Sequence, residues 1–218
     1  MSTLNFTSGD TTFRNNKAVY DGGIRTSSST LHFTGNTIFR SNSAEDGGGI
    51  YAWYCTLNFS GNTIFRNNSA KDGGGVNTWY NTLNFIGNVT FKENSAKKNC
   101  GGIWAFYSTL NFTGNATFRN NSASFGGGIC IFTSDLDIAE NREDNITGTC
   151  CECYHSFTLI FIDNSATIHG GAVYTTDSTL NFDGYNIFNG NSALYYGGGI
   201  YSENSTLNFG TSTTFSSN

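Results

Sequence analysis

Hydrophobic and polar residues alternate in short runs that return every 26 or 27 positions along the chain. Each copy opens with the run T-L-x-F, in which one polar residue separates Leu from Phe, so both side chains share one face of an extended strand. A second run, T-I-F, and a third run after a glycine cluster complete the copy. Self-similarity at this period predicts a solenoid in which each unit packs on its neighbours. The leucines that open the copies are Leu4, Leu31, Leu57, Leu83, Leu110, Leu180 and Leu207.

Three short β-branched runs per copy, with no stretch of helical period, predict three strands per coil. The chain has 27 Gly and no Pro, which suits a sheet because Pro would remove a ladder hydrogen bond from almost any coil. We therefore expect an all-β fold, a right-handed single-stranded parallel β-helix of about eight coils that forms one domain over residues 1–218. A solenoid with two strands per coil is the structural alternative.

Three residue types recur at fixed places between the second run and the glycines. A phenylalanine in the second run is expected to stack inward, at Phe13, Phe39, Phe65, Phe91, Phe118, Phe161, Phe188 and Phe215. An asparagine three positions later suits a tight corner and can bond its equivalents along the axis, at Asn16, Asn42, Asn68, Asn94, Asn121, Asn164, Asn191 and Asn218. The alanine two positions further on is expected to face the interior.

One interruption breaks the period. Leu136 and Leu180 open successive copies but stand 44 positions apart, which leaves about 18 residues of insertion at the first corner, 139–156. Loops on a rigid scaffold commonly carry binding function.

The cysteines gather near this insert. Disulfides are expected among Cys150, Cys151 and Cys153, or from one of them to Cys130 on the preceding coil, with free thiols as the alternative. Cys55 and Cys100 are not expected to pair with each other. Three Cys and His155 so close in sequence rarely converge on one ion, so we expect no metal.

A stripe of cations follows the phenylalanines of the second run. Stacked like charges repel unless they are compensated, and Asp21, Glu45, Asp46 and Asp72 are candidate partners. We expect a solvated stripe, with a track for a sulfated polysaccharide as the alternative. The stripe consists of Arg14, Arg40, Arg66, Lys92 and Arg119.

An aromatic strip is predicted on the third run. If Ile50, Val76, Ile103 and Ile129 point inward, alternation sends the aromatic residues of coils two to five outward, whereas the other coils largely lack them. Such a strip can dock sugar rings or an apolar partner, although plain cross-strand stacking or cover by a loop would also account for it. Its members are Tyr51, Trp53, Trp79, Trp104, Phe106 and Phe132.

Charge is uneven along the chain. The net charge is −5, yet residues 1–134 hold ten Lys and Arg against six Asp and Glu, whereas residues 135–218 hold one against ten. Neither part has the basic density of a nucleic-acid binder, so no nucleic-acid partner is expected. No signal peptide and no run of transmembrane length is visible, and the bare first and last strands are expected to belong to a longer rod.

The paired motifs F-x-x-N and G-G-A-[ILV] occur at Phe161–Asn164 and Gly170–Val173, and F-x-x-N with G-G-G-I occurs elsewhere. They resemble the repeats of chlamydial polymorphic outer membrane proteins and, more widely, of pectin-lyase-like adhesin β-helices. The resemblance implies a cell-surface or extracellular passenger domain used in adhesion, associated with the outer membrane in a bacterium.

We therefore expect a non-catalytic domain without a cofactor, whose partner is a host or neighbouring cell-surface protein or glycan. The alternative is a polysaccharide lyase or hydrolase of the pectin-lyase-like fold, which needs clustered carboxylates. Only Asp135 and Asp137 pair locally. Ice binding by the outward Thr ranks is a third possibility, but His32 interrupts the neighbouring Asn rank.

Overall fold

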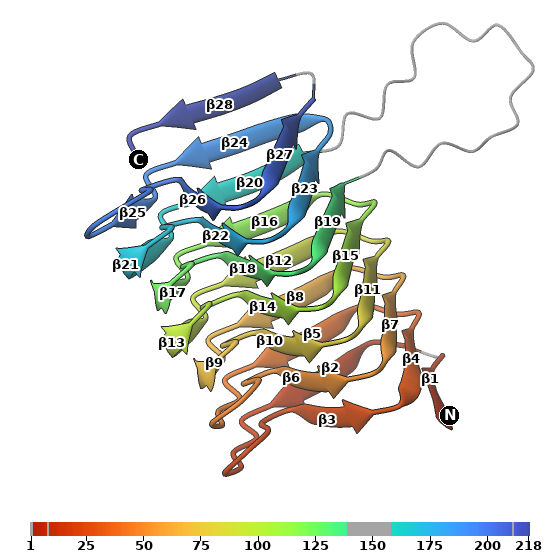
Figure 1. Ribbon diagram of the computed structural model, residues 1–218. Coiled ribbons are helices and arrows are strands. Elements are labelled where there is room, and N and C mark those ends of the chain that lie inside the picture. The colour runs from red at the N-terminus through yellow and green to blue at the C-terminus, as the bar shows by residue number, and fades with distance from the viewer. Residues whose placement is uncertain (1, 8, 139–157, 211) are drawn as a thin grey trace, which may run out of the picture.

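The computed structural model describes residues 2–7, 9–138, 158–210 and 212–218, and every regular element in these ranges is a strand. Each strand pairs in parallel with its equivalent one repeat away, which gives three long sheets and one short one (Figure 1). The structure confirms the predicted parallel β-helix, with seven complete turns and the first two strands of an eighth.

The four sheets collect equivalent strands from successive coils. Sheet 1 contains β1 (Ser2–Phe6), β4 (Ser29–Phe33), β7 (Thr56–Phe59), β11 (Thr82–Phe85), β15 (Thr109–Phe112), β19 (Asp135–Ile138), β23 (Thr179–Phe182) and β27 (Thr206–Phe209). Sheet 2 contains β2 (Thr11–Arg14), β5 (Thr37–Arg40), β8 (Thr63–Arg66), β12 (Val89–Lys92), β16 (Ala116–Arg119), β20 (Thr158–Ile162), β24 (Tyr185–Asn189) and β28 (Ser212–Ser216). Sheet 3 contains β3 (Ile24–Ser27), β6 (Ile50–Trp53), β10 (Val76–Trp79), β14 (Ile103–Phe106), β18 (Ile129–Phe132), β22 (Val173–Thr176) and β26 (Ile200–Glu203). The short sheet contains β9 (Ser69–Asp72), β13 (Ser95–Asn99), β17 (Ser122–Phe125), β21 (Ser165–His169) and β25 (Ser192–Ala193).

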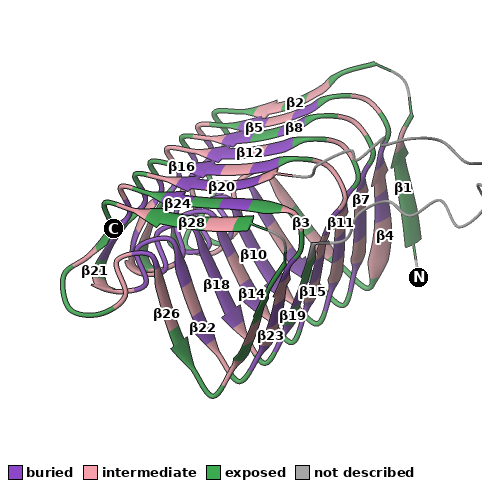
Figure 2. Ribbon diagram, turned by 90° about the horizontal axis from the view of Figure 1, so that it is seen from above, coloured by how far each residue is buried: buried purple, intermediate pink, exposed green. Residues whose placement is uncertain are grey.

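The short sheet is the main difference from the prediction of three strands per coil. It projects as a fin, defined here as residues 17–23 and their equivalents, at the corner between sheets 2 and 3 (Figure 2). The chain turns outward after each buried corner asparagine, and in coil 3 it returns through Gly73, whose φ is 66°. A Cβ on Gly74 would collide with the backbone of Ser95, so backbone packs directly on backbone inside the fin.

The alanines after the corner follow the prediction only in part. Ala70, Ala123 and Ala166 are buried, whereas Ala44 and Ala96 are half-buried and Ala18 is exposed. In the first four coils these alanines also line a groove along the fin, at Ala18, Ala44, Ala70 and Ala96.

Two columns of phenylalanine fill the cylinder. Rings of the second run stack on their equivalents at centroid distances from 4.5 Å for Phe65–Phe91 to 5.0 Å for Phe118–Phe161. The phenylalanines of the first run stack in the same way, and the two columns meet edge to face, as Phe85 and Phe91 do at 6.0 Å. The predicted inward stack is confirmed, and these rings dominate the fully buried side chains.

The corner asparagines form the predicted ladder. The side-chain amide of Asn42 donates to Oδ1 of Asn68 at 3.0 Å, and the pattern repeats to Asn218. A second buried ladder closes the corner before sheet 1, where the backbone N–H of Ser108 donates to Oγ of Ser134 at 2.9 Å.

The register of both flanking sheets continues across the interruption. β19 pairs with β15 and β23, and β20 pairs with β16 and β24. The strands before and after the interruption therefore belong to the same coil and keep the register of their sheets. The predicted insert, 139–156, lies outside the described residues.

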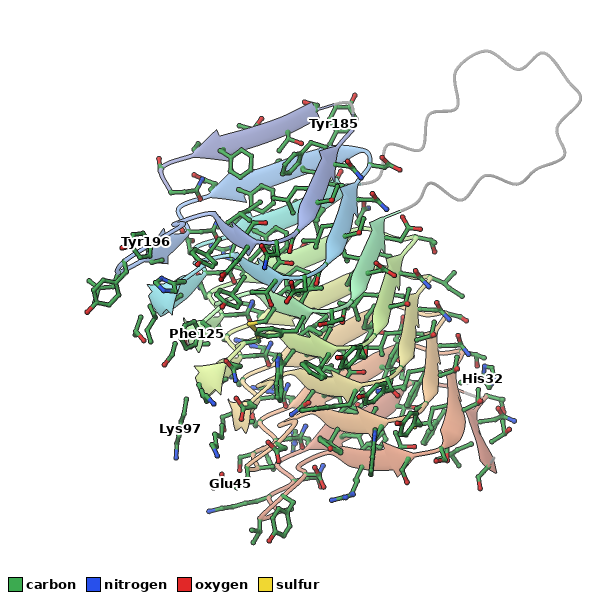
Figure 3. All side chains as sticks on the ribbon, viewed as in Figure 1. His32, Glu45, Lys97, Phe125, Tyr185 and Tyr196 are labelled. Atoms are coloured by element: carbon green, nitrogen blue, oxygen red, sulfur yellow. A yellow bond between two sulfur atoms is a disulfide. The ribbon has the colours of Figure 1, made fainter. Side chains whose placement is uncertain are left out.

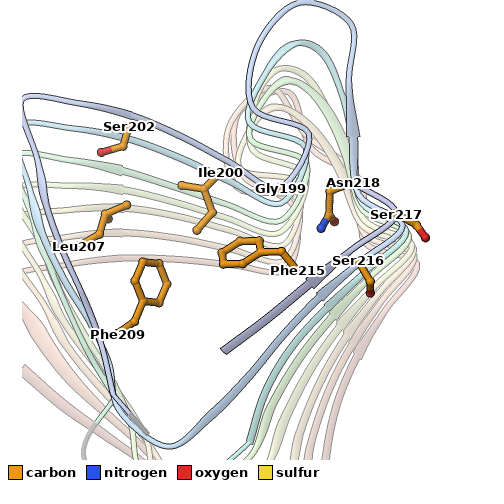
Figure 4. Close-up of a pocket in the computed structure, with 9 residues that line it drawn as sticks. All are labelled: Gly199, Ile200, Ser202, Leu207, Phe209, Phe215, Ser216, Ser217 and Asn218. Carbon is orange, nitrogen blue, oxygen red and sulfur yellow. The ribbon is translucent and has the colours of Figure 1, made fainter. Parts of the chain in front are cut away.

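The last turn displays the cross-section of the core. Leu207, Phe209 and Phe215 line a hollow of about 540 Å³ together with Ile200 and Asn218 (Figure 4).

Candidate functional site

Sheet 3 carries the predicted aromatic strip on its outer face. Ile50, Val76, Ile103 and Ile129 are fully buried, as the alternation requires, and the aromatic residues beside them point outward. Trp53 is 44% exposed, whereas the other members of the strip are half-buried.

Contacts within the strip explain the difference in exposure. Trp79 packs on Phe106 at a centroid distance of 4.6 Å and edge to face on Trp104 at 5.1 Å. The indole N–H of Trp79 donates to Oδ1 of Asn77 at 2.9 Å, which fixes the ring. Phe106 and Phe132 continue the cluster at 6.3 Å.

The strip runs further than the sequence predicted. Phe132 contacts Tyr174 at 5.5 Å, and Tyr174 stacks on Tyr201 at 5.2 Å, so aromatic contacts reach coil 7. The predicted limit to coils two to five is therefore wrong. Phe125 and Tyr196 join from the fin, where Figure 3 places them along the same edge of the molecule.

A second aromatic column was missed. Tyr54, Tyr80 and Tyr107 occupy the corner after sheet 3 with left-handed backbone, at φ values of 53°, 57° and 47°. Their rings stack at 4.9 and 5.0 Å, and Tyr54 also contacts Trp53 at 5.4 Å. Their recurrence one position after Trp53, Trp79 and Phe106 was the signal in the sequence. We call the strip and this column together the aromatic face.

The angle between the fin and sheet 3 becomes acidic toward the N-terminal coils. The backbone of Asp46 forms β-bridges with Asp21 in the preceding coil and with Asp72 in the next coil, so the three carboxylates stack. Asp21 also forms an ion pair with Arg25 at 2.8 Å. Burial raises the pKa of Asp46, and the neighbouring carboxylates of Asp72 and Asp21 add to the shift. Burial and the charge of Asp46 likewise raise the pKa of Tyr51.

The basic stripe lies in register on the outer face of sheet 2. Its partner differs from the predicted acids: Glu93 accepts ion pairs from Arg66 at 3.1 Å and from Lys92 at 3.4 Å. Burial acts to raise the pKa of Glu93, but the hydrogen bonds from Arg66 and Lys92 outweigh it and lower that pKa. In the described part of the chain, Arg14, Arg40 and Arg119 form no ion pair.

The predicted disulfide partner of Cys130 is wrong. Cys130 is bonded to Cys100 on the preceding coil, with 5.6 Å between the Cα atoms. Cys130 lies on the outer face of β18, and the two sulfur atoms meet beside Gly126, where the fin leaves no room for a side chain. Cys55 is buried and free, and Cys150, Cys151 and Cys153 lie outside the described residues.

The acids that the sequence offered for hydrolysis lie on the surface of the C-terminal coils. Asp135 and Asp137 lie exposed on the outer face of sheet 1, and Asp163 and Asp177 occupy separate left-handed corners. Within the described ranges, no group of three His, Cys, Asp or Glu residues is arranged to hold a metal ion.

Over the part of the chain that the structure covers, no helix is long and apolar enough to cross a membrane.

A protein-family model matches three parts of the chain. The model of the Chlamydia polymorphic membrane protein (Chlamydia_PMP) repeat matches residues 31–52, 158–176 and 187–203. Curated proteins and solved structures gave no significant match. The matched segments contain the corner asparagines and glycine corners that build coils 2, 6 and 7. The three matched segments are thus repeats of the Chlamydia polymorphic membrane protein type, and they stack in a parallel β-helix. This combination indicates the passenger domain of a surface or outer-membrane protein.

Proposed function

We propose that the chain is a non-catalytic adhesion module at the cell surface, and that its aromatic face binds a protein on a host or neighbouring cell. One observation supports this proposal above the others: four large aromatic side chains stay exposed side by side on one face, by between 41% and 52%. Large exposed apolar patches on soluble surfaces commonly mark interaction sites. The four are Trp53, Tyr54, Tyr80 and Tyr107.

The stacking favours a protein over a sugar as the partner. Tyr80 lies between Tyr54 and Tyr107, so the faces of its ring are covered and its edge and hydroxyl remain for the partner. A sugar ring that stacks on an aromatic residue needs an open ring face. Tyr and Trp edges with a polar tip are instead typical of the energetically dominant positions in protein interfaces.

The test is binding of the labelled chain to cultured cells, compared with a triple variant, Trp53→Ser, Tyr80→Asn and Tyr107→Asn. Asn is chosen for the two corners because it tolerates left-handed backbone. We expect the variant to lose at least about tenfold in affinity, since hot-spot residues carry most of the binding energy. Protease treatment of the cells should abolish binding by the unaltered chain.

A matched control removes two exposed apolar residues from another face. Tyr185→Ser with Ile187→Ser, both on β24 of sheet 2, should bind as the unaltered chain does. Equal loss in both variants, or binding that survives protease but not glycosidase treatment of the cells, contradicts a protein partner at the aromatic face.

The runner-up is cleavage of a polysaccharide. Asp163 and Asp177 lie at separate corners, and Asp135 and Asp137 share the exposed outer face of sheet 1. Asp21, Asp46 and Asp72 do lie together, but Asp21 is already paired with Arg25, so we rank catalysis below adhesion. Release of reducing ends or unsaturated products from pectin-type polymers would reverse this ranking.

A further inference from the structure

A groove follows the fin across the first four coils. It has a volume of about 720 Å³ and is lined in each coil by three consecutive residues directly after the corner asparagine. Figure 3 shows two of its members, Glu45 and Lys97, along the fin.

The lining of the groove is basic. Lys17, Lys71 and Lys97 line it, against a single carboxylate, Glu45. Among the residues that the structure describes, none of the three lysines forms an ion pair. The charge of Lys71 also acts on the nearby carboxylate of Asp46, but no carboxylate holds any of the three lysine side chains in place.

The basic stripe extends this charge around the adjacent corner. Only two residues separate Arg14 from Lys17, and Arg14 stacks in register with Arg40. Beyond coil 5 the equivalent positions on sheet 2 are uncharged, because Ile162 and Asn189 occupy them. The basic surface thus runs parallel to the rod axis and ends part-way along the rod.

The floor of the groove suits a sulfated chain better than a nucleic acid. Its lining residues are mostly small, which lets a polymer approach the backbone, and the hydroxyls of Ser43, Ser69 and Ser95 can donate hydrogen bonds to anionic oxygens. Single-stranded nucleic acids are held by aromatic side chains on which their bases stack. None of the described residues that line the groove is aromatic.

We propose that this groove binds a linear sulfated polysaccharide that lies along the rod axis, held by Lys17, Lys71 and Lys97 and flanked by the basic stripe. The site uses none of the residues of the aromatic face, so it stands or falls independently of the adhesion proposed above. Electrostatic attraction of this kind weakens as salt screens the charges.

The test measures binding of a fluorescent heparin-derived oligosaccharide to the full chain by fluorescence anisotropy, at low and at physiological salt. A triple variant should bind the oligosaccharide about tenfold more weakly, because each exposed charge contributes only a modest binding free energy. Its substitutions are Lys17→Gln, Lys71→Gln and Lys97→Gln. Glu45→Gln removes the one acidic lining residue and should tighten binding. The triple variant of the aromatic face should bind as the unaltered chain does.

Two single substitutions of neighbouring lysines distinguish binding in the groove from attraction by the net charge of the chain. Lys98 is exposed next to Lys97 on β13 but does not line the groove, so Lys97→Gln should weaken binding more than Lys98→Gln. Equal effects of these two substitutions, or no saturable binding by the unaltered chain, overturns the proposal. Single-stranded DNA of similar length that binds as tightly as the oligosaccharide also overturns it.

Discussion

The side-chain amide of Asn94 donates to Oδ1 of Asn121 at 3.1 Å and to the carbonyl oxygen of Phe65 at 2.9 Å. The backbone N–H of Asn94 donates to the same Oδ1 at 3.0 Å, and Asn94 itself is fully buried. One side chain therefore links three successive coils at the corner where the chain leaves sheet 2. Corner geometry and axial bonding are satisfied by the same residue type, which explains why asparagine recurs there.

Asn94→Ala should be strongly destabilising. The substitution removes the side-chain amide that bonds Asn121 and Phe65, and leaves buried acceptors unsatisfied, so we expect a loss of about 2–4 kcal/mol in the free energy of unfolding. Urea unfolding followed by circular dichroism measures it. Asn84→Ala is the control, because Asn84 belongs to a half-buried ladder on the outer face of sheet 1 and should cost less than about 1 kcal/mol. Similar losses in the two variants contradict the ladder's structural role.

Cys130→Ser should lower stability by about 2–4 kcal/mol, because the disulfide with Cys100 restricts the unfolded chain. Cys100→Ser should have a similar effect, and the double variant should be little worse than either single one. Cys55→Ser is the control, since Ser108 and Ser134 fill the equivalent corner in other coils. Additive losses from the two single substitutions, measured by urea unfolding, argue against the bond.

Asp46→Asn should raise stability at neutral pH. Burial raises the pKa of Asp46 above its ordinary value of 3.8, with Asp72 and Asp21 adding to the shift. Its contribution is therefore fully present below the unfolded pKa and is lost as the pH rises through the folded pKa. The difference from the unaltered chain should appear as the pH rises from acid to neutral. Thermal unfolding across that range tests this, with the exposed substitution Asp183→Asn measured in parallel as the control for loss of one surface carboxylate.

Glu93→Gln should lower the melting temperature at neutral pH, because Arg66 and Lys92 lose their shared counter-ion. The lowered pKa of Glu93 means that its contribution is present above the unfolded value of 4.5 and is lost as the pH falls through the folded pKa. The difference from the unaltered chain should shrink in acid and at high salt. Asp10→Asn serves as the comparison. An effect of Glu93→Gln that is independent of both salt and pH contradicts the assignment.

Much of the fold could be predicted because the columns are visible in the sequence. Phe65 and Phe91 stand one period apart, and they stack as the pattern requires. The outward direction of Trp53 followed from the inward direction of Ile50 in the same way. These inferences need only the repeat period and the alternation of a strand.

The features that were missed depend on contacts between different sectors of a coil. Whether Cys130 could reach Cys100 depended on how closely the fin packs against sheet 3, which the spacing of the cysteines does not reveal. Glu93 sits at a left-handed corner, where its side chain turns back to the stripe on sheet 2. The fin could not be predicted from the repeat, because the spacing of the alanine and the three glycines does not reveal that their backbones pack into a separate lobe.

Identical columns also make the rod modular. Oδ1 of Asn68 accepts a hydrogen bond from Asn42 in the preceding coil, just as Oδ1 of Asn94 accepts one from Asn68. Removal or duplication of one whole period would therefore join each column to a matching neighbour. Repeats of this design can change in number by recombination between copies without a new packing solution. The rod can therefore grow or shorten one turn at a time, so that its length becomes a heritable variable rather than a fixed property of the fold.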